Sequence, residues 1–244
     1  MLCACQKELH SDTGTQEGNF RLNIRFDPVV DGRPLAFDAT NTNFSGEPYT
    51  VKTFKFYISQ IDLSATDGSV YRVNRNNYYL INEADLSSTT ISLTPPTRSY
   101  SQLSFAIGVD SARNVSGAQT GALDPANGMF WTWNSGYIMA KLEGSSPLSG
   151  APDNRIEYHI GGFKEPYNVL RRVVLPLSST GAVSFQSGST NTLAVSANVN
   201  AWFHEPYELR IAKTPVWMTP GDTALRIAQN YSRMFTATTL TRNP

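Results

Sequence analysis

Two histidines are the residues of this sequence whose type and position best suit metal chemistry. His159 lies at the end of a predicted strand over 155–159, and His204 at the end of another that runs through 199–204. Neighbouring strands can bring such ends to one rim of a sheet, and neutral imidazole suits copper, zinc, iron or nickel. We therefore predict a metal site at His159 and His204. The chain holds 3 His, and the third, His10, lies in a polar N-terminal segment.

Sulfur side chains extend this hypothesis toward copper. Met129, Met139 and Met218 carry thioethers, which are soft ligands that favour Cu(I). Methionine is also a common core residue, so burial is the competing interpretation for each of them. Copper is therefore one candidate metal, and zinc or calcium in its place stays open.

Aromatic residues form the next candidate group. Trp131 and Trp133 alternate in an extended segment, so their side chains should share one side and form an aromatic platform. Trp202 lies close to His204. These three tryptophans are possible stacking residues or modified residues, and packing of the loop onto a sheet is the alternative for Trp131 and Trp133.

Motifs for other chemistries do not occur in the sequence. It has no Gly-x-Ser-x-Gly nucleophile elbow, no phosphate-binding loop and no dinucleotide-binding glycine motif. No spacing supports a Ser-His-Asp triad or a carboxylate pair. The charge balance of 20 Lys+Arg against 20 Asp+Glu argues against a nucleic-acid partner. We predict a binding protein and not an enzyme.

Short alternating segments indicate the elements that must position these residues. Turn signals every 8–12 residues between them predict an all-β fold, a single antiparallel sandwich or barrel-like domain over 19–244. A long functional loop should span 110–134, and one short C-terminal helix should contain 225–234, capped by Asp222 or Thr223. The predicted strands lie at 20–26, 51–61, 70–73, 78–81, 91–93, 103–109, 137–142, 155–160, 170–177 and 193–203.

Polar residues in and beside the loop suggest further roles. Asp110, Asp124 and Asn134 are oxygen ligands that suit calcium, although capping of the loop is the stronger interpretation. Lys141 and Glu143 share a strand face, and we predict a structural ion pair between them.

The loop and the strand that follows it resemble the signature of the MbnP-like family. The matching segments are Gly-Val-Asp-Ser at 108–111, Gly-Ala-Leu-Asp-Pro at 121–125, Gly-Met-Phe-Trp-Thr-Trp-Asn-Ser-Gly-Tyr-Ile at 128–138 and Lys-Leu-Glu-Gly at 141–144. Tyr-His-Ile-Gly-Gly at 158–162 and the segment 227–235 are similar to further family elements. The resemblance covers about residues 20–235.

This resemblance implies a β-sandwich or barrel that binds copper outside the cytoplasm. In such proteins two histidines and a kynurenine, made from tryptophan by a di-haem peroxidase-like partner, hold the metal. A TonB-dependent uptake system is a further implied partner. His159 matches a motif position and His204 matches by type, whereas Glu157 stands where a relative carries the tryptophan. Trp131 and Trp133 are the candidate oxidation sites here.

The first residues point to the same compartment. Leu-Cys-Ala-Cys at 2–5 resembles a bacterial lipobox, which implies that Cys5 is lipidated and that residues 1–18 are a lipobox remnant and a flexible tether. We therefore expect a lipoprotein of the bacterial periplasm or the outer-membrane surface, held to the membrane through its lipid anchor.

Two other functions remain open. The chain can be a ligand-binding accessory module of an outer-membrane uptake system, in which Trp131, Trp133 and Trp202 stack on a glycan or a metallophore. It can also be a structural surface protein that keeps the family fold without a metal.

Overall fold

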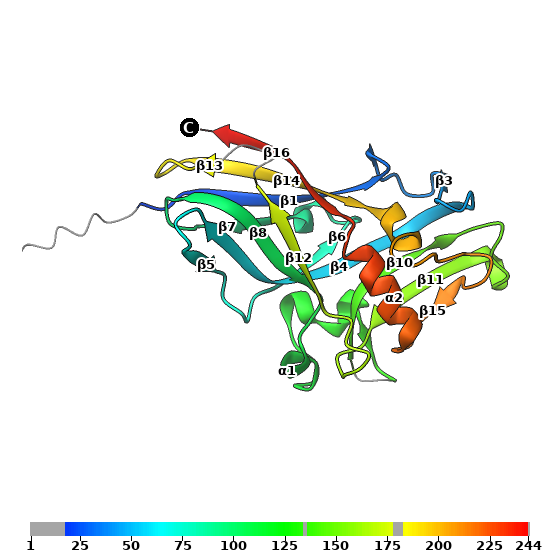
Figure 1. The fold of residues 1–244 in the computed structure, drawn as a ribbon. Helices are drawn as coiled ribbons and strands as arrows, with labels where there is room; N and C mark the ends of the chain where they lie inside the picture. Colours follow the sequence, from blue (N-terminus) through cyan, green and yellow to red (C-terminus); the bar gives the residue numbers. More distant parts are fainter. Residues whose placement is uncertain (1–17, 134–135, 178–182, 244) are drawn as a thin grey trace, which may run out of the picture.

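Two β-sheets make up the protein in the computed structural model, which describes residues 18–133, 136–177 and 183–243 (Figure 1). The smaller sheet has the order β16-β14-β1-β2, with β7 also paired to β1. β1 and β14 run parallel, and β14 pairs antiparallel with β16. The strands of this sheet are β1 (Arg21–Val30), β2 (Arg33–Pro34), β7 (Thr90–Leu93), β14 (Thr190–Asn198) and β16 (Phe235–Asn243).

The larger sheet has the order β12-β8-β4-β10-β11-β15, and its pairings are antiparallel except for β11 with β15. Short strands pair with β4, β8 and β10 at its margins. Its main strands are β4 (Pro48–Ala65), β8 (Ser99–Ile107), β10 (Gly136–Ser145), β11 (Arg155–Gly161), β12 (Arg171–Pro176) and β15 (Val216–Trp217). The short ones are β3 (Asn41–Thr42), β5 (Val70–Arg72), β6 (Tyr78–Asn82), β9 (Phe130–Trp131) and β13 (Val183–Ser184).

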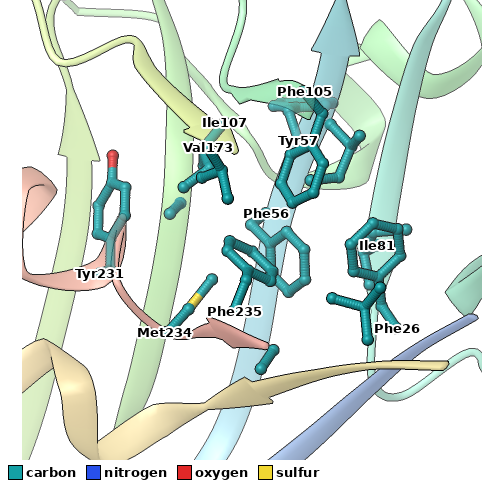
Figure 2. Close-up of a cluster of buried hydrophobic side chains, with 14 of the residues drawn as sticks. Phe26, Phe56, Tyr57, Ile81, Phe105, Ile107, Val173, Tyr231, Met234 and Phe235 are labelled. Atoms are coloured by element: carbon teal, nitrogen blue, oxygen red, sulfur yellow. The ribbon is translucent and has the colours of Figure 1, made fainter. Parts of the chain in front are cut away.

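Four phenylalanines join the two sheets. Phe26 of β1 and Phe235 of β16 meet Phe56 of β4 and Phe105 of β8, with ring centroids 5.1–5.9 Å apart and edge-to-face geometry. Figure 2 shows Phe26, Phe56 and Phe235 side by side in this core. Edge-to-face contacts add about 0.5–1.5 kcal/mol per pair to the burial of the rings themselves. The inward face of both sheets is fixed by this contact.

Helical segments are short. α2 (Asp222–Tyr231) confirms the predicted C-terminal helix, but its N-cap is Gly221 without a side-chain cap, so the prediction of Asp222 or Thr223 as cap was wrong. The remaining segments are α1 (Ser111–Asn114), η1 (Leu86–Thr89), η2 (Gly121–Leu123), η3 (Pro125–Asn127), η4 (Pro152–Asn154) and η6 (Val199–Phe203). None of the helices in the described residues is long and apolar enough to cross a membrane.

The mostly-β fold class is confirmed, with local differences. The sheets are mixed and not purely antiparallel as predicted, because β1 pairs in parallel with β14 and β11 with β15. The short strands β2, β3, β9 and β15 were not predicted. The predicted strand over 193–203 ends at Asn198, because the Asn198 side chain accepts the amide hydrogen of Asn200 and caps η6. β16 follows α2 and was not predicted, since its Thr-rich sequence shows little hydrophobic alternation. Cys5, His10 and all of the proposed segment 1–18 except Gly18 lie outside the described residues.

Gly144 allows β10 to lie against β4. The register between these strands shifts from Glu143↔Thr53 to Gly144↔Val51, and a methyl group added at Gly144 would lie 1.9 Å from the carbonyl oxygen of Thr50. No side chain fits at this contact. The Lys-Leu-Glu-Gly motif thus ends in a glycine for a steric reason.

We predict that Gly144→Ala destabilises the protein by about 2 kcal/mol or more, because a strand backbone must move. Gly150→Ala is the matched control, since a methyl group there would meet no atom within 4 Å. Urea unfolding of both variants measures the effect. Equal midpoints for the two variants would contradict the steric explanation.

Candidate metal-binding face

His159 lies on the outer face of the larger sheet. Ile156, Tyr158 and Ile160 of β11 are buried, so the alternate residues Glu157 and His159 point to the other side. β11 continues to Gly161, and His159 therefore stands within the strand and not at its end. Its side chain is 14% exposed.

A carboxylate holds the imidazole of His159. The Nε2 atom of His159 lies 2.7 Å from Oε1 of Glu143, which belongs to the neighbouring strand β10. Lys141 sits directly across from His159, and its Nζ lies 3.5 Å from the same carboxylate oxygen. The ion pair predicted between Lys141 and Glu143 is confirmed, but His159 is the closer partner of Glu143.

The carboxyl group of Glu143 has a pKa lowered to about 2. The hydrogen bond with His159 is the largest cause, and burial opposes it by disfavouring the charged form. A hydrogen bond with Thr53 and the charge of Lys141 lower it further. Glu143 is therefore an anion at neutral pH and a fixed acceptor for a ring N–H of His159.

Lys55 extends this polar row onto β4. It pairs with Lys141 across the strands, and its Nζ donates to the carbonyl of Asn127 at 3.2 Å. Burial lowers the pKa of the Lys55 ammonium, and the charge of Lys141 lowers it further. The hydrogen bond from Lys55 to Asn127 therefore ties the sheet to the loop that begins at 110.

This arrangement leaves one ring nitrogen of His159 available. A metal-binding histidine commonly donates its other ring N–H to a carboxylate, which fixes the tautomer and the ring orientation. β15 pairs in parallel with β11 through Glu157↔Val216 and Tyr158↔Trp217, and the next residues along the two strands are His159 and Met218. Met218 is half-buried and directly follows the end of β15 at Trp217, which makes it the methionine nearest in sequence to this pairing.

The other two methionines are core residues. Met129 and Met139 are fully buried, and the Met139 sulfur accepts the amide hydrogen of Val109 at 3.0 Å. In the described part of the chain, no group of three or more His, Cys, Asp or Glu residues could hold a metal ion. A metal site on this face must therefore combine His159 with a sulfur ligand, or with fewer than two further residues of these four types.

His204 has different surroundings. It follows η6 as the C-cap residue and is not at a strand end, because the strand stops at Asn198. Its ring stacks on Phe44 with centroids 4.5 Å apart, its Nε2 lies 3.6 Å from Oε1 of Glu205, and its side chain is 42% exposed. His204 thus belongs to an exposed aromatic pair.

The structure does not bring His159 and His204 to shared partners. The ring of Phe203 lies 6.1 Å from that of Tyr158, which faces the core. His159 is the next residue after Tyr158 and faces the opposite side of β11. Tyr158 contacts the segment that precedes His204, whereas His159 faces the other side of the strand.

The tryptophans divide into three environments. Trp131 is 5% exposed and packs on Gly161, where an added methyl group would lie 2.7 Å from its ring. Trp133 is 64% exposed, and its ring centroid lies 5.4 Å from that of Trp131, as expected for residues that share a side. Trp202 is fully buried against Tyr231, so its interpretation as a ligand-stacking residue was wrong.

The acidic residues of the loop act as caps. The Asp110 carboxylate accepts the amide hydrogen of Arg113 and bonds the hydroxyl of Tyr78. Asp124 accepts the amide hydrogen of Ala126 and caps η3. Asn134 lies outside the described residues. The stronger of the two interpretations, capping, thus agrees with the geometry of Asp110 and Asp124.

We predict that Glu143 makes the metal-free protein less stable in acid. The ionised form of an acid with a depressed pKa contributes stability above its ordinary pKa of 4.5, and this contribution is lost as the pH falls through about 2. Urea midpoints of the wild type and Glu143→Gln should therefore converge between pH about 6 and pH about 2. Glu157→Gln, in the neighbouring strand, is the control. A gap between the Glu143→Gln and wild-type midpoints that stays constant with pH would contradict the prediction.

Comparison with solved structures finds a protein of similar fold. A solved structure, MbnP from Methylosinus trichosporium, superposes with a TM-score of 0.53 at 16% sequence identity, over 84% of this chain and 83% of that one. At this identity the likeness concerns the fold. Comparison with curated proteins finds none that matches.

The family model for MbnP matches residues 19–219, which include β1, the loop and the strands that carry Glu143 and His159. This match covers most of the described chain, and of the strands that the structure describes only β16 lies beyond it. The chain therefore belongs to the MbnP family.

Proposed function

We propose that this protein binds copper outside the cytoplasm, with His159 as the anchoring ligand, and that it captures or delivers the metal without turnover. The contact of 2.7 Å between His159 Nε2 and Glu143 carries the proposal. It fixes the orientation of the imidazole through one ring nitrogen, which is the usual arrangement of a metal-binding histidine.

Cu(I) is the oxidation state that these residues suit best. Nitrogen from imidazole and sulfur from a thioether are ligands that copper accepts, whereas calcium requires several oxygen ligands. Met218, which directly follows the last residue of β15 that pairs with β11, is the soft side chain assigned to this site. His204 stays the alternative second imidazole, and the variant His204→Ala tests whether the site contains two histidines.

The family resemblance supplies the proposed setting. Lipidation at Cys5 would hold the domain at the periplasmic or outer-membrane surface, where a TonB-dependent uptake system can accept cargo. Trp133 is the tryptophan more accessible to a di-haem peroxidase-like partner, because it is 64% exposed while Trp131 is buried. Intact mass of the native protein reports whether either residue is oxidised.

We predict that His159→Ala weakens Cu(I) binding more than Glu143→Gln does, and that Glu143→Gln weakens it by about tenfold or more. Competitive titration with a chromogenic Cu(I) chelator measures both affinities. His204→Ala should leave the affinity unchanged if His159 anchors the site. Unchanged copper affinity in both histidine variants would overturn the proposal.

Met218→Leu distinguishes a thioether ligand from a site made of nitrogen and oxygen. We expect it to weaken Cu(I) binding and to leave any Zn²⁺ binding unchanged, because zinc prefers imidazole, carboxylate and thiolate. Met139→Leu is the matched control, since Met139 is a buried core residue. Equal Cu(I) affinities in the two variants would remove Met218 from the site.

We predict that Cys5→Ser releases the protein from the membrane fraction. Acyl chains at Cys5 are the proposed anchor, and the variant cannot be acylated there. Fractionation after expression of the full chain with its export signal, together with labelling by a fatty-acid analogue, measures the effect. Cys3→Ser is the control and should stay acylated. A Cys5→Ser protein that keeps the label would contradict the assignment.

A further inference from the structure

We infer that a pocket beside Trp131 is a second binding site, independent of the metal, for one aromatic ring that carries a hydroxyl group, that is, a simple phenol. The pocket opens where β11 ends and where the loop returns to the sheet. Its lining is mainly aromatic: Trp131, Tyr137, Phe163, Tyr167 and Pro220, with Lys164 and Glu165.

Two glycines help to shape the space. A methyl group at Gly162 would lie 2.5 Å from the carbonyl oxygen of Tyr167, and the residue has a φ of +141°, which favours glycine. A methyl group at Gly136 would lie 3.3 Å from the ring of Phe163. The pocket has a volume of about 160 Å³. A cavity of about 150 Å³ admits one benzene ring, so the size fits a single ring.

An unmet hydrogen-bond donor marks the site. Trp131 is 5% exposed, and its indole N–H is buried without an acceptor among the residues that the structure describes. Buried donors almost always have a partner, because burial without one removes the hydrogen bond that water would supply. An oxygen atom of a ligand in this pocket can be that acceptor.

The small number of polar groups selects the class of ligand. A sugar ring carries several hydroxyls that all need partners, whereas the side chains of this pocket offer the Trp131 N–H, the hydroxyl of Tyr167 and the charged groups of Lys164 and Glu165. The hydroxyl of Tyr137 is already bonded to the carbonyl of Leu123 at 2.8 Å. A ligand with one hydroxyl group matches these polar groups. Its oxygen accepts a hydrogen bond from the Trp131 N–H, and its hydrogen can be donated to Glu165 or to water.

Aromatic walls favour an aromatic ring over an aliphatic one. Trp133 extends the wall outward, because its ring contacts Trp131 and is largely exposed. Lys164 lies over the ring of Phe163 at 5.6 Å, so its charge is partly engaged, and Glu165 balances it. The rim therefore does not select a strongly charged ligand.

The experiment compares two probes that differ by one group, 4-fluorophenol and fluorobenzene, by ¹⁹F NMR titration of the metal-free full chain. We expect 4-fluorophenol to bind the wild type more tightly, and Trp131→Phe to weaken it by about fivefold, the effect of one hydrogen bond. Fluorobenzene should bind Trp131→Phe and the wild type alike. Gly136→Ala, which narrows the pocket, should weaken both probes.

A second measurement does not depend on the folding of a variant. The chain has 4 Trp, and their indole N–H signals are resolved in a ¹⁵N-labelled sample. One of these signals should shift with 4-fluorophenol and not with fluorobenzene, and Trp133→Phe should leave that shifting signal present. No binding of either probe, or equal binding of both with no indole shift, would overturn the inference. Loss of copper binding in His159→Ala would not affect it.

Discussion

The contact among Phe26, Phe235, Phe56 and Phe105 decides which side of β1, β16, β4 and β8 faces inward. These rings join strands from both sheets, and successive side chains of a strand point to opposite faces, so fixing one ring fixes the faces of its whole strand. In β4 and β10 the residues between the buried ones then face outward. A slip of one residue would send the Lys141 and Glu143 side chains into the core, where unpaired charges are costly. The polar row around His159 is therefore a consequence of the aromatic core.

Two short motifs combine packing and chemistry residue by residue. In Lys-Leu-Glu-Gly, Leu142 is buried, Lys141 and Glu143 face the imidazole of the neighbouring strand, and Gly144 clears the carbonyl of Thr50. In His-Ile-Gly, Ile160 is buried, His159 forms a hydrogen bond with the Glu143 carboxylate, and Gly161 leaves room for Trp131. The glycines admit a backbone atom in one motif and an aromatic ring in the other. Every position of both motifs is constrained, either by packing or by a polar contact.

Local pattern predicted much of the fold and less of the candidate site. Alternation located β1 and β8, and helical spacing located α2, because each pattern reports burial within one segment. The partnership of Glu143 with His159 depends on the register between β10 and β11, which no single segment contains. His204 was misplaced because alternation in 193–203 continues past the Asn198 side chain that starts η6. The burial of Trp202 depends on its contact with Tyr231 of α2, which the sequence around Trp202 does not reveal.

The parallel pairing of β1 with β14 has a consequence for how the chain assembles. β1 lies in the middle of its sheet, yet Arg21 pairs with Thr190, near the other end of the sequence. β1 leaves a ribosome or a translocation channel before the other strands of its sheet. It thus has β7 as an early neighbour and waits for β14 and β16 to complete the sheet. Contacts so distant in sequence slow folding, since a long loop must close before they form. Until then the apolar side of β1, with Phe20, Leu22, Ile24 and Phe26, is without its final cover, and a holding chaperone would find its binding segment there.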